Sequence, residues 1–138
     1  MPAINYMAVA IAGVAGWFVG AGWYGAFGKQ WMAALGWTEA DCTGPDGKRH
    51  MPMGPMVLSV IANLIMALML AGVTGHIVPR PTIVAGIASG ALVWFGFVVT
   101  TMAVNNAFSK RTLALTLIDG GHWLAVLVVQ GAVLGLFG

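Results

Sequence analysis

Apolar and polar positions follow one another along the chain in long blocks. Four apolar blocks cover residues 4–27, 55–75, 82–104 and 113–137. A helix rises about 1.5 Å per residue, so each block is long enough to cross a hydrocarbon core of roughly 30 Å. Backbone groups in lipid must be hydrogen-bonded within the protein, and a helix achieves this within one segment. We therefore predict an all-α polytopic membrane protein, with residues 1–138 forming a single four-transmembrane-helix bundle.

The connections between the blocks carry turn-forming residues. Glycine, proline and asparagine recur in residues 28–53, 76–81 and 105–112, as is typical of turns and loops. Within the first connection, residues 29–35 are expected to lie on the membrane surface as a short amphipathic turn.

Composition supports a membrane environment. Hydrophobic residues make up 59% of the chain and charged residues only 7%, whereas soluble proteins carry about 25% charged residues. The lipid bilayer is therefore the expected partner of most of the surface. The six Lys and Arg residues are too few and too dispersed for a nucleic-acid interface.

The basic residues predict an orientation. Cytoplasmic connections are usually rich in Lys and Arg, and the first and third connections together hold five of the six. We expect these connections to be cytoplasmic and both termini to be non-cytoplasmic. Trp23, Lys29 and Trp31 are the expected anchors at the cytoplasmic interface. The five basic residues are Lys29, Lys48, Arg49, Lys110 and Arg111.

Two short motifs carry a family resemblance. The first, Gly22-Trp23-Tyr24-Gly25-Ala26-Phe27-Gly28-Lys29-Gln30-Trp31, resembles a Trp-Tyr…Phe-Gly-Lys-x-Trp pattern. The second is Leu117-Ile118-Asp119-Gly120-Gly121-His122. The chain resembles, from end to end, a bacterial domain-of-unknown-function family of small four-helix membrane proteins. The resemblance implies a multi-pass protein of the bacterial inner (cytoplasmic) membrane and brings no activity.

Asp119 is the only acidic residue within the four predicted spans. Inserting a charge at the centre of a bilayer costs about 2.5–3.5 kcal/mol, so such a residue is a functional candidate. Thr116 lies on the same face of the predicted helix, and His122 follows Asp119 at a spacing that lets the two side chains meet.

Polar residues of the other spans lie at a depth similar to that of Asp119. We predict a cytoplasm-facing polar pocket to which all four helices contribute. The alternative is a hydrogen-bond network that only holds the helices together. The expected pocket residues are Asp119, His122, Asn63, Ser59, Thr100, Thr101, Asn105, Tyr24 and Thr116.

Metal and cofactor chemistry has little support in the sequence. Asp119 and His122 are two ligands, whereas a zinc site needs three or four. The soft ligands near the second span, which suit monovalent copper, are His50, Met51, Met53 and Cys42. Met is also common at membrane boundaries, and we expect no metal and no cofactor. The chain carries no catalytic motif that we recognise, so we expect no catalytic residues and no enzyme.

Two functions stay open at this point. One is a small proton- or cation-linked transporter or channel that uses the pocket around Asp119. The other is a non-catalytic accessory or assembly subunit of a larger membrane complex. Close glycine pairs at Gly16/Gly20, Gly86/Gly90 and Gly131/Gly135 allow helices to approach closely. They indicate either packing within one chain or a homo-oligomer.

Overall fold

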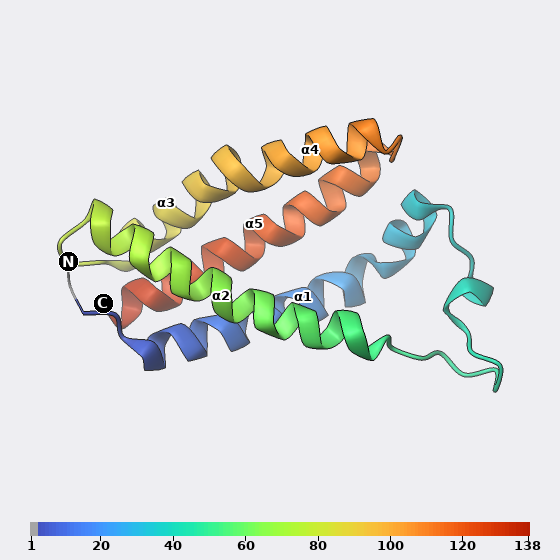
Figure 1. Cartoon of the computed structure of the whole chain (residues 1–138), viewed down its shortest axis with the longest axis horizontal. Helices are drawn as coiled ribbons and strands as arrows, with labels where there is room; N and C mark the ends of the chain where they lie inside the picture. The colour runs from blue at the N-terminus through green and yellow to red at the C-terminus, as the bar shows by residue number, and fades with distance from the viewer. Residues whose placement is uncertain (1–2) are drawn as a thin grey trace.

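The computed structural model describes residues 3–138 and consists of helices joined by short connections (Figure 1). Four helical segments are long and apolar enough to cross a membrane, which confirms the all-α four-helix prediction. The start of α1 and the C-terminus lie at the same end of the bundle, opposite the first connection. The segments are α1 (Tyr6–Leu35), η1 (Glu39–Cys42) in the first connection, α2 (Met53–Ile77), α3 (Ile83–Val93), η2 (Trp94–Val98), α4 (Val99–Phe108) and α5 (Leu113–Leu136).

Polar side chains cap three of the helices. The side chains of Asn5, Thr82 and Thr112 accept hydrogen bonds from backbone N–H groups three residues further on. Such caps satisfy donors that have no partner inside the helix. Helix α1 ends at Gly36, whose left-handed φ of 73° suits a residue without a side chain.

Helix α1 is longer than the sequence predicted. Residues 29–35 continue α1 instead of forming a separate turn on the membrane surface. The segment contains Lys, Gln, Met, Ala and Leu, which favour helix, and no Gly or Pro to end it. Met32 is buried, and the continuous helix carries Trp31 along the same side of the bundle as Tyr24.

The third crossing is interrupted by a π-helical segment. Residues Trp94–Val98 form η2, where the Val99 N–H donates to the carbonyl of Trp94. A π-helical segment has an i→i+5 pattern and is frequent at functional sites. The wider turn rotates the face of α4 relative to α3, so an uninterrupted helical pattern misplaces the residues of α4.

Glycines bring α3 and α5 into backbone contact. A side chain on Gly86 would collide with the backbone of Gly131, and one on Gly90 with the carbonyl of Leu127. Gly135 meets the backbone of Thr82 in the same way. Two of the three predicted glycine pairs therefore pack these helices within the chain, as small residues commonly do in membranes.

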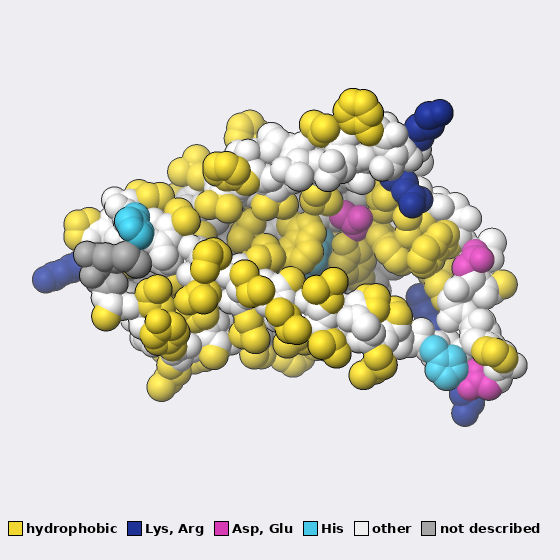
Figure 2. Space-filling model, in the orientation of Figure 1, with side chains coloured by type: hydrophobic (Ala, Val, Ile, Leu, Met, Phe, Trp, Pro, Cys, Tyr) yellow, Lys and Arg dark blue, Asp and Glu magenta, His cyan; other side chains and the backbone are white. Residues whose placement is uncertain are grey.

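Helix α5 is the centre of the bundle, and one side of the bundle is open. Over residues 3–138, α5 contacts α1, α2, α3, η2 and α4. Helix α2 contacts α3 but neither η2 nor α4. The two segments therefore separate toward the first connection, and the face between them is hollowed, with an acidic side chain visible inside (Figure 2). We call this hollow the α2–α4 opening.

Candidate functional site

The partner of Asp119 is a tyrosine of α1. Asp119 lies in the second turn of α5 and is partly exposed. The Tyr24 hydroxyl donates a hydrogen bond of 2.5 Å to the carboxylate. Trp31, two turns further along α1, packs edge-on against the Tyr24 ring with centroids 5.8 Å apart. The Trp31 indole also approaches the carboxylate.

His122 is buried beside this pair. Only 6% of its surface is exposed, and its ring lies 4.9 Å from that of Tyr24 and 4.5 Å from that of Trp123. Its Nδ1 atom has no hydrogen-bond partner among the described residues. The spacing of Asp119 and His122 lets the two side chains meet, but the carboxylate of Asp119 accepts its hydrogen bond from Tyr24. The ring of Tyr24 also packs against the imidazole of His122. Gly20 makes room for the imidazole, because a Cβ there would lie 2.9 Å from Nε2.

Two further indoles hold the turn of α5 that carries Asp119. The Trp23 N–H donates to the carbonyl of Ile118 at 3.1 Å, and the Trp94 N–H donates to that of Gly120 at 2.7 Å. The two acceptors belong to the residues on either side of Asp119. The indoles come from α1 and η2, so they fix this turn from two sides.

The predicted interface anchors differ in their surroundings. Trp23 and Trp31 are partly buried and contact α5 or Tyr24. Lys29 is exposed. Trp94 was missed altogether. Its position in the middle of an apolar span was a usable signal, because tryptophan is enriched at the two interfaces of a membrane.

A second polar cluster lies deeper in the bundle. The amide nitrogen of Gln130 donates to the carbonyl and side-chain oxygens of Asn63, at 3.1 and 3.2 Å. The Asn63 amide donates to the carbonyl of Ser59, and the Trp17 indole donates to the Ser59 hydroxyl. Ser59 and Asn63 were predicted to join Asp119, but here they link α2 to α1 and α5. A Cβ on Gly16 would lie 2.5 Å from Asn63 and 2.6 Å from Gln130, so this predicted glycine pair also packs within the chain.

Comparison with known proteins places the chain in a family. A protein-family model described as "Protein of unknown function (DUF1761)" matches residues 7–135. The chain belongs to this family. The match confirms the resemblance to a domain-of-unknown-function family and supports a membrane protein with four apolar helices. No curated protein and no solved structure matches the chain.

The end of the third crossing contributes less than the sequence predicted. Thr100, Thr101 and Asn105 are exposed, and the two hydroxyls donate to carbonyls of their own crossing, Gly96 and Phe97. The rotation introduced by η2 turns these side chains away from Asp119. Asn106 takes the inward position, and its amide donates to the hydroxyl of Thr116 at 2.9 Å. The Asn106–Thr116 bond lies near the first turn of α5.

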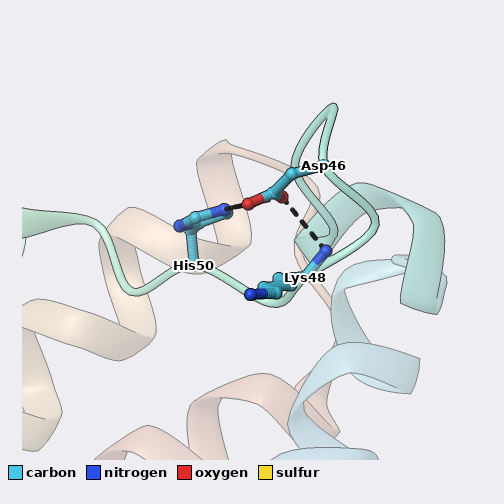
Figure 3. Close-up of polar contacts among 3 residues, drawn as sticks. All are labelled: Asp46, Lys48 and His50. Atoms are coloured by element: carbon cyan, nitrogen blue, oxygen red, sulfur yellow. Dashed lines mark hydrogen bonds and ion pairs between the residues drawn. The ribbon is translucent and has the colours of Figure 1, made fainter.

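The candidate soft ligands of the first connection have different neighbours. His50 bonds the Asp46 carboxylate at 2.8 Å, and the Lys48 N–H donates to the same group (Figure 3). The hydrogen bond from His50 holds the pKa of Asp46 below its usual value. The Cys42 thiol lies 4.0 Å from the sulfur of Met32. Met51 and Met53 are exposed.

Three buried polar atoms have no partner among the described residues. They are the Thr74 hydroxyl, Nδ1 of His122 and the side-chain oxygen of Gln130. Thr74 lines a cavity of about 310 Å³ at the end of the bundle where the termini lie. Buried polar groups are normally hydrogen-bonded, so each of these atoms can still form a hydrogen bond to water or to a ligand.

Proposed function

We propose that this membrane protein is a small proton- or cation-linked transporter or channel, and that the ion binds at Asp119. The observation that carries the proposal is the position of the carboxylate. The carboxylate is partly exposed in the α2–α4 opening and accepts from Tyr24, and two indoles hold the backbone carbonyls of the residues on either side of it. Ionisable groups within membrane spans commonly mark ion or substrate pathways.

The buried polar atoms that have no hydrogen-bond partner support the passage of an ion across the bundle. His122 lies one turn beyond Asp119, and Gln130 lies two turns beyond His122 on α5. Thr74 on α2 follows toward the end with the termini, where its cavity opens. These groups lie between the α2–α4 opening and the opposite end of the bundle. Val126 is fully buried between His122 and Gln130, so a path through them is closed in this conformation.

The proposed setting is a bacterial inner membrane, with the first and third connections in the cytoplasm. One end of the bundle carries the first and third connections, and the other carries the second connection, which contains Arg80, with the start of α1 and the C-terminus (Figure 1). The asymmetry of basic residues supports this orientation. In this orientation, the α2–α4 opening lies in the cytoplasmic half of the bilayer.

The second candidate is a non-catalytic accessory or assembly subunit of a larger membrane complex. The α2–α4 opening favours this function, because a helix from a partner protein or from a second copy of the chain could pack between α2 and α4. The three glycine pairs no longer argue for a homo-oligomer, since all of them pack within the chain. Native mass measurement in mild detergent distinguishes a monomer from a homo-oligomer.

Ion flux into liposomes tests the proposed transport. Purified protein is reconstituted with a pH-sensitive dye inside the vesicles, and proton and potassium flux are measured under imposed gradients. The wild type is expected to carry one of these ions, and Asp119→Asn is expected to lose most of the flux. Asp46→Asn, which removes an acid of the exposed first connection, serves as the control.

The structural alternative gives a different result. If Asp119 only holds the bundle, Asp119→Asn lowers thermal stability without a separate loss of activity. A silent wild type, or flux through Asp119→Asn equal to that of the wild type, would overturn the proposed transport.

A further inference from the structure

Four aromatic side chains lie on or against the part of α5 that carries Asp119. Tyr24 bonds it and Trp31 approaches it from α1. Trp123 lies four residues after Asp119 and therefore on the same face of α5. Trp94 of η2 is bonded to the next residue of α5, Gly120. All four side chains are partly exposed, so none of them is sealed in a closed core.

A carboxylate among aromatic rings recognises cations. The faces of Trp and Tyr rings carry negative potential and attract a cation within about 6 Å of the ring centroid. The N–H of Trp94 is already bonded to a backbone carbonyl, so its ring offers mainly its π surface. Lys29 lies in α1 and the other five basic residues lie in the connections, and over residues 3–138 none of them forms an ion pair with Asp119.

The ligand set suits an organic cation better than a metal ion. Calcium takes about six to eight oxygen ligands, and magnesium needs octahedral oxygen coordination. The site offers one carboxylate, and one of its oxygens already accepts from Tyr24. Over residues 3–138 no cluster of three or more His, Cys, Asp or Glu side chains is placed to hold a metal ion. A quaternary ammonium or phosphonium group needs only the charge and the ring faces.

Exposed apolar side chains lie on the elements at either side of the opening. Exposed side chains on α2 include Val57, Leu58 and Ile61, and those on α4 and η2 include Phe97 and Val104. A ligand that enters between these helices therefore meets hydrocarbon-like side chains before it reaches the carboxylate. A lipophilic cation dissolved in the bilayer can follow this route, whereas a hydrated inorganic ion would lose its water there.

We propose that the α2–α4 opening binds a lipophilic organic cation, which enters laterally from the bilayer and pairs its charge with Asp119. Tyr24, Trp31, Trp94 and Trp123 form the aromatic walls of the site. The inference rests on the proposed function in using the same carboxylate, and it adds the substrate class and the route of entry.

Binding to the purified protein in detergent tests the inference. Equilibrium dialysis compares tetraphenylphosphonium with tetraphenylborate, an anion of nearly the same size and shape. Saturable binding is expected for the cation and not for the anion. Asp119→Asn is expected to weaken binding of the cation at least about tenfold, because it removes the charge and keeps the shape.

A second variant tests the aromatic walls independently of the charge. Trp31→Leu is expected to weaken binding about threefold, the scale of one cation–π contact. Trp17→Leu is the matched control, because Trp17 bonds Ser59 in the deeper cluster and should leave binding unchanged. Circular dichroism and thermal unfolding verify that each variant is folded.

The results separate this inference from the proposed transport. Equal binding of both ions, no saturable binding by the wild type, or equal loss in the two tryptophan variants would overturn the organic-cation site. Asp119-dependent proton or potassium flux without tetraphenylphosphonium binding would also overturn it while leaving the transport proposal intact. Specific binding without any flux would support the site and overturn transport.

Discussion

Two clusters of polar side chains lie inside this bundle, and they differ in charge and in access. The Asp119 cluster (Tyr24, Asp119 and His122) contains ionisable groups and reaches the surface through the α2–α4 opening. The Asn63 cluster (Trp17, Ser59, Asn63 and Gln130) contains no ionisable group, and Gln130 is fully buried. The first therefore has the character of a site and the second that of a link between helices.

The difference has a physical cause. A buried amide carries no charge, and the amide nitrogen of Gln130 donates to Asn63 across two helices, so the cluster avoids most of the cost of burial although the Gln130 oxygen has no partner among the described residues. A buried carboxylate is costly unless it is paired or reached by solvent. Asp119 has a tyrosine partner and partial exposure, so its neighbours leave it accessible to a ligand. Under the proposed function, the pocket expected from the sequence corresponds to the Asp119 cluster, and the structural network corresponds to the Asn63 cluster.

Removing Gln130 should give the largest loss of stability. Gln130→Ala deletes two hydrogen bonds to Asn63 and leaves a cavity, which together should cost about 2–4 kcal/mol of unfolding free energy. Reversible unfolding in mixed micelles measures the change. A loss below that of Asp119→Asn would reverse the assignment of the two clusters.

Crowding the Asn63 cluster should cost somewhat less. The Cβ of Gly16→Ala would lie 2.5 Å from Asn63 and 2.6 Å from Gln130, and overpacking typically costs about 1–3 kcal/mol. Gly22→Ala is the matched control on the same helix, because among the described residues its added Cβ would meet nothing within 4 Å apart from the neighbouring backbone of α1 itself. Comparing the thermal unfolding of the two variants separates the cost of packing from the gain in helix propensity. Equal stability of the two variants would show that the Asn63 cluster rearranges without cost.

Neutralising Asp119 should change stability only slightly. In Asp119→Asn the side-chain oxygen can still accept from Tyr24, so the change should stay within about 1 kcal/mol. The same unfolding assay applies. A loss of several kcal/mol would identify Asp119 as a structural residue and remove the contrast between the two clusters.

The smallest effect is expected outside the helices, at Asp46. Because the hydrogen bond from His50 lowers its pKa in the folded protein, Asp46 stabilises the first connection above its unfolded pKa. This contribution is lost as pH falls below about 4, where the carboxylate becomes protonated. Hydrogen exchange of the Lys48 amide, which donates to Asp46, should accelerate in that range relative to Asp46→Asn. Identical pH profiles would contradict the role of the carboxylate.

Much of this protein is determined by local sequence. The number of membrane crossings and the starts of α3 and α5 follow from apolar length and from the capping residues Thr82 and Thr112, because these signals act within one segment. The polar face of α5 that includes Asp119 is likewise readable from helical spacing. The length of α1 was misjudged because aromatic and charged residues were taken as a membrane boundary, although the segment contains no helix-ending residue before Gly36.

Only the tertiary structure decided which polar groups meet. Helical spacing places Asp119 and His122 on neighbouring faces but does not reveal that Tyr24 comes between them. The π-helical η2 rotated α4, so Asn106 replaced Asn105 and Thr101 faced outward. Backbone contacts at Gly86 and Gly131 drew α3 onto α5 and left α2 apart from α4. Rotation and tilt of whole helices are set by contacts between distant segments, whereas the sequence pattern describes each helix alone.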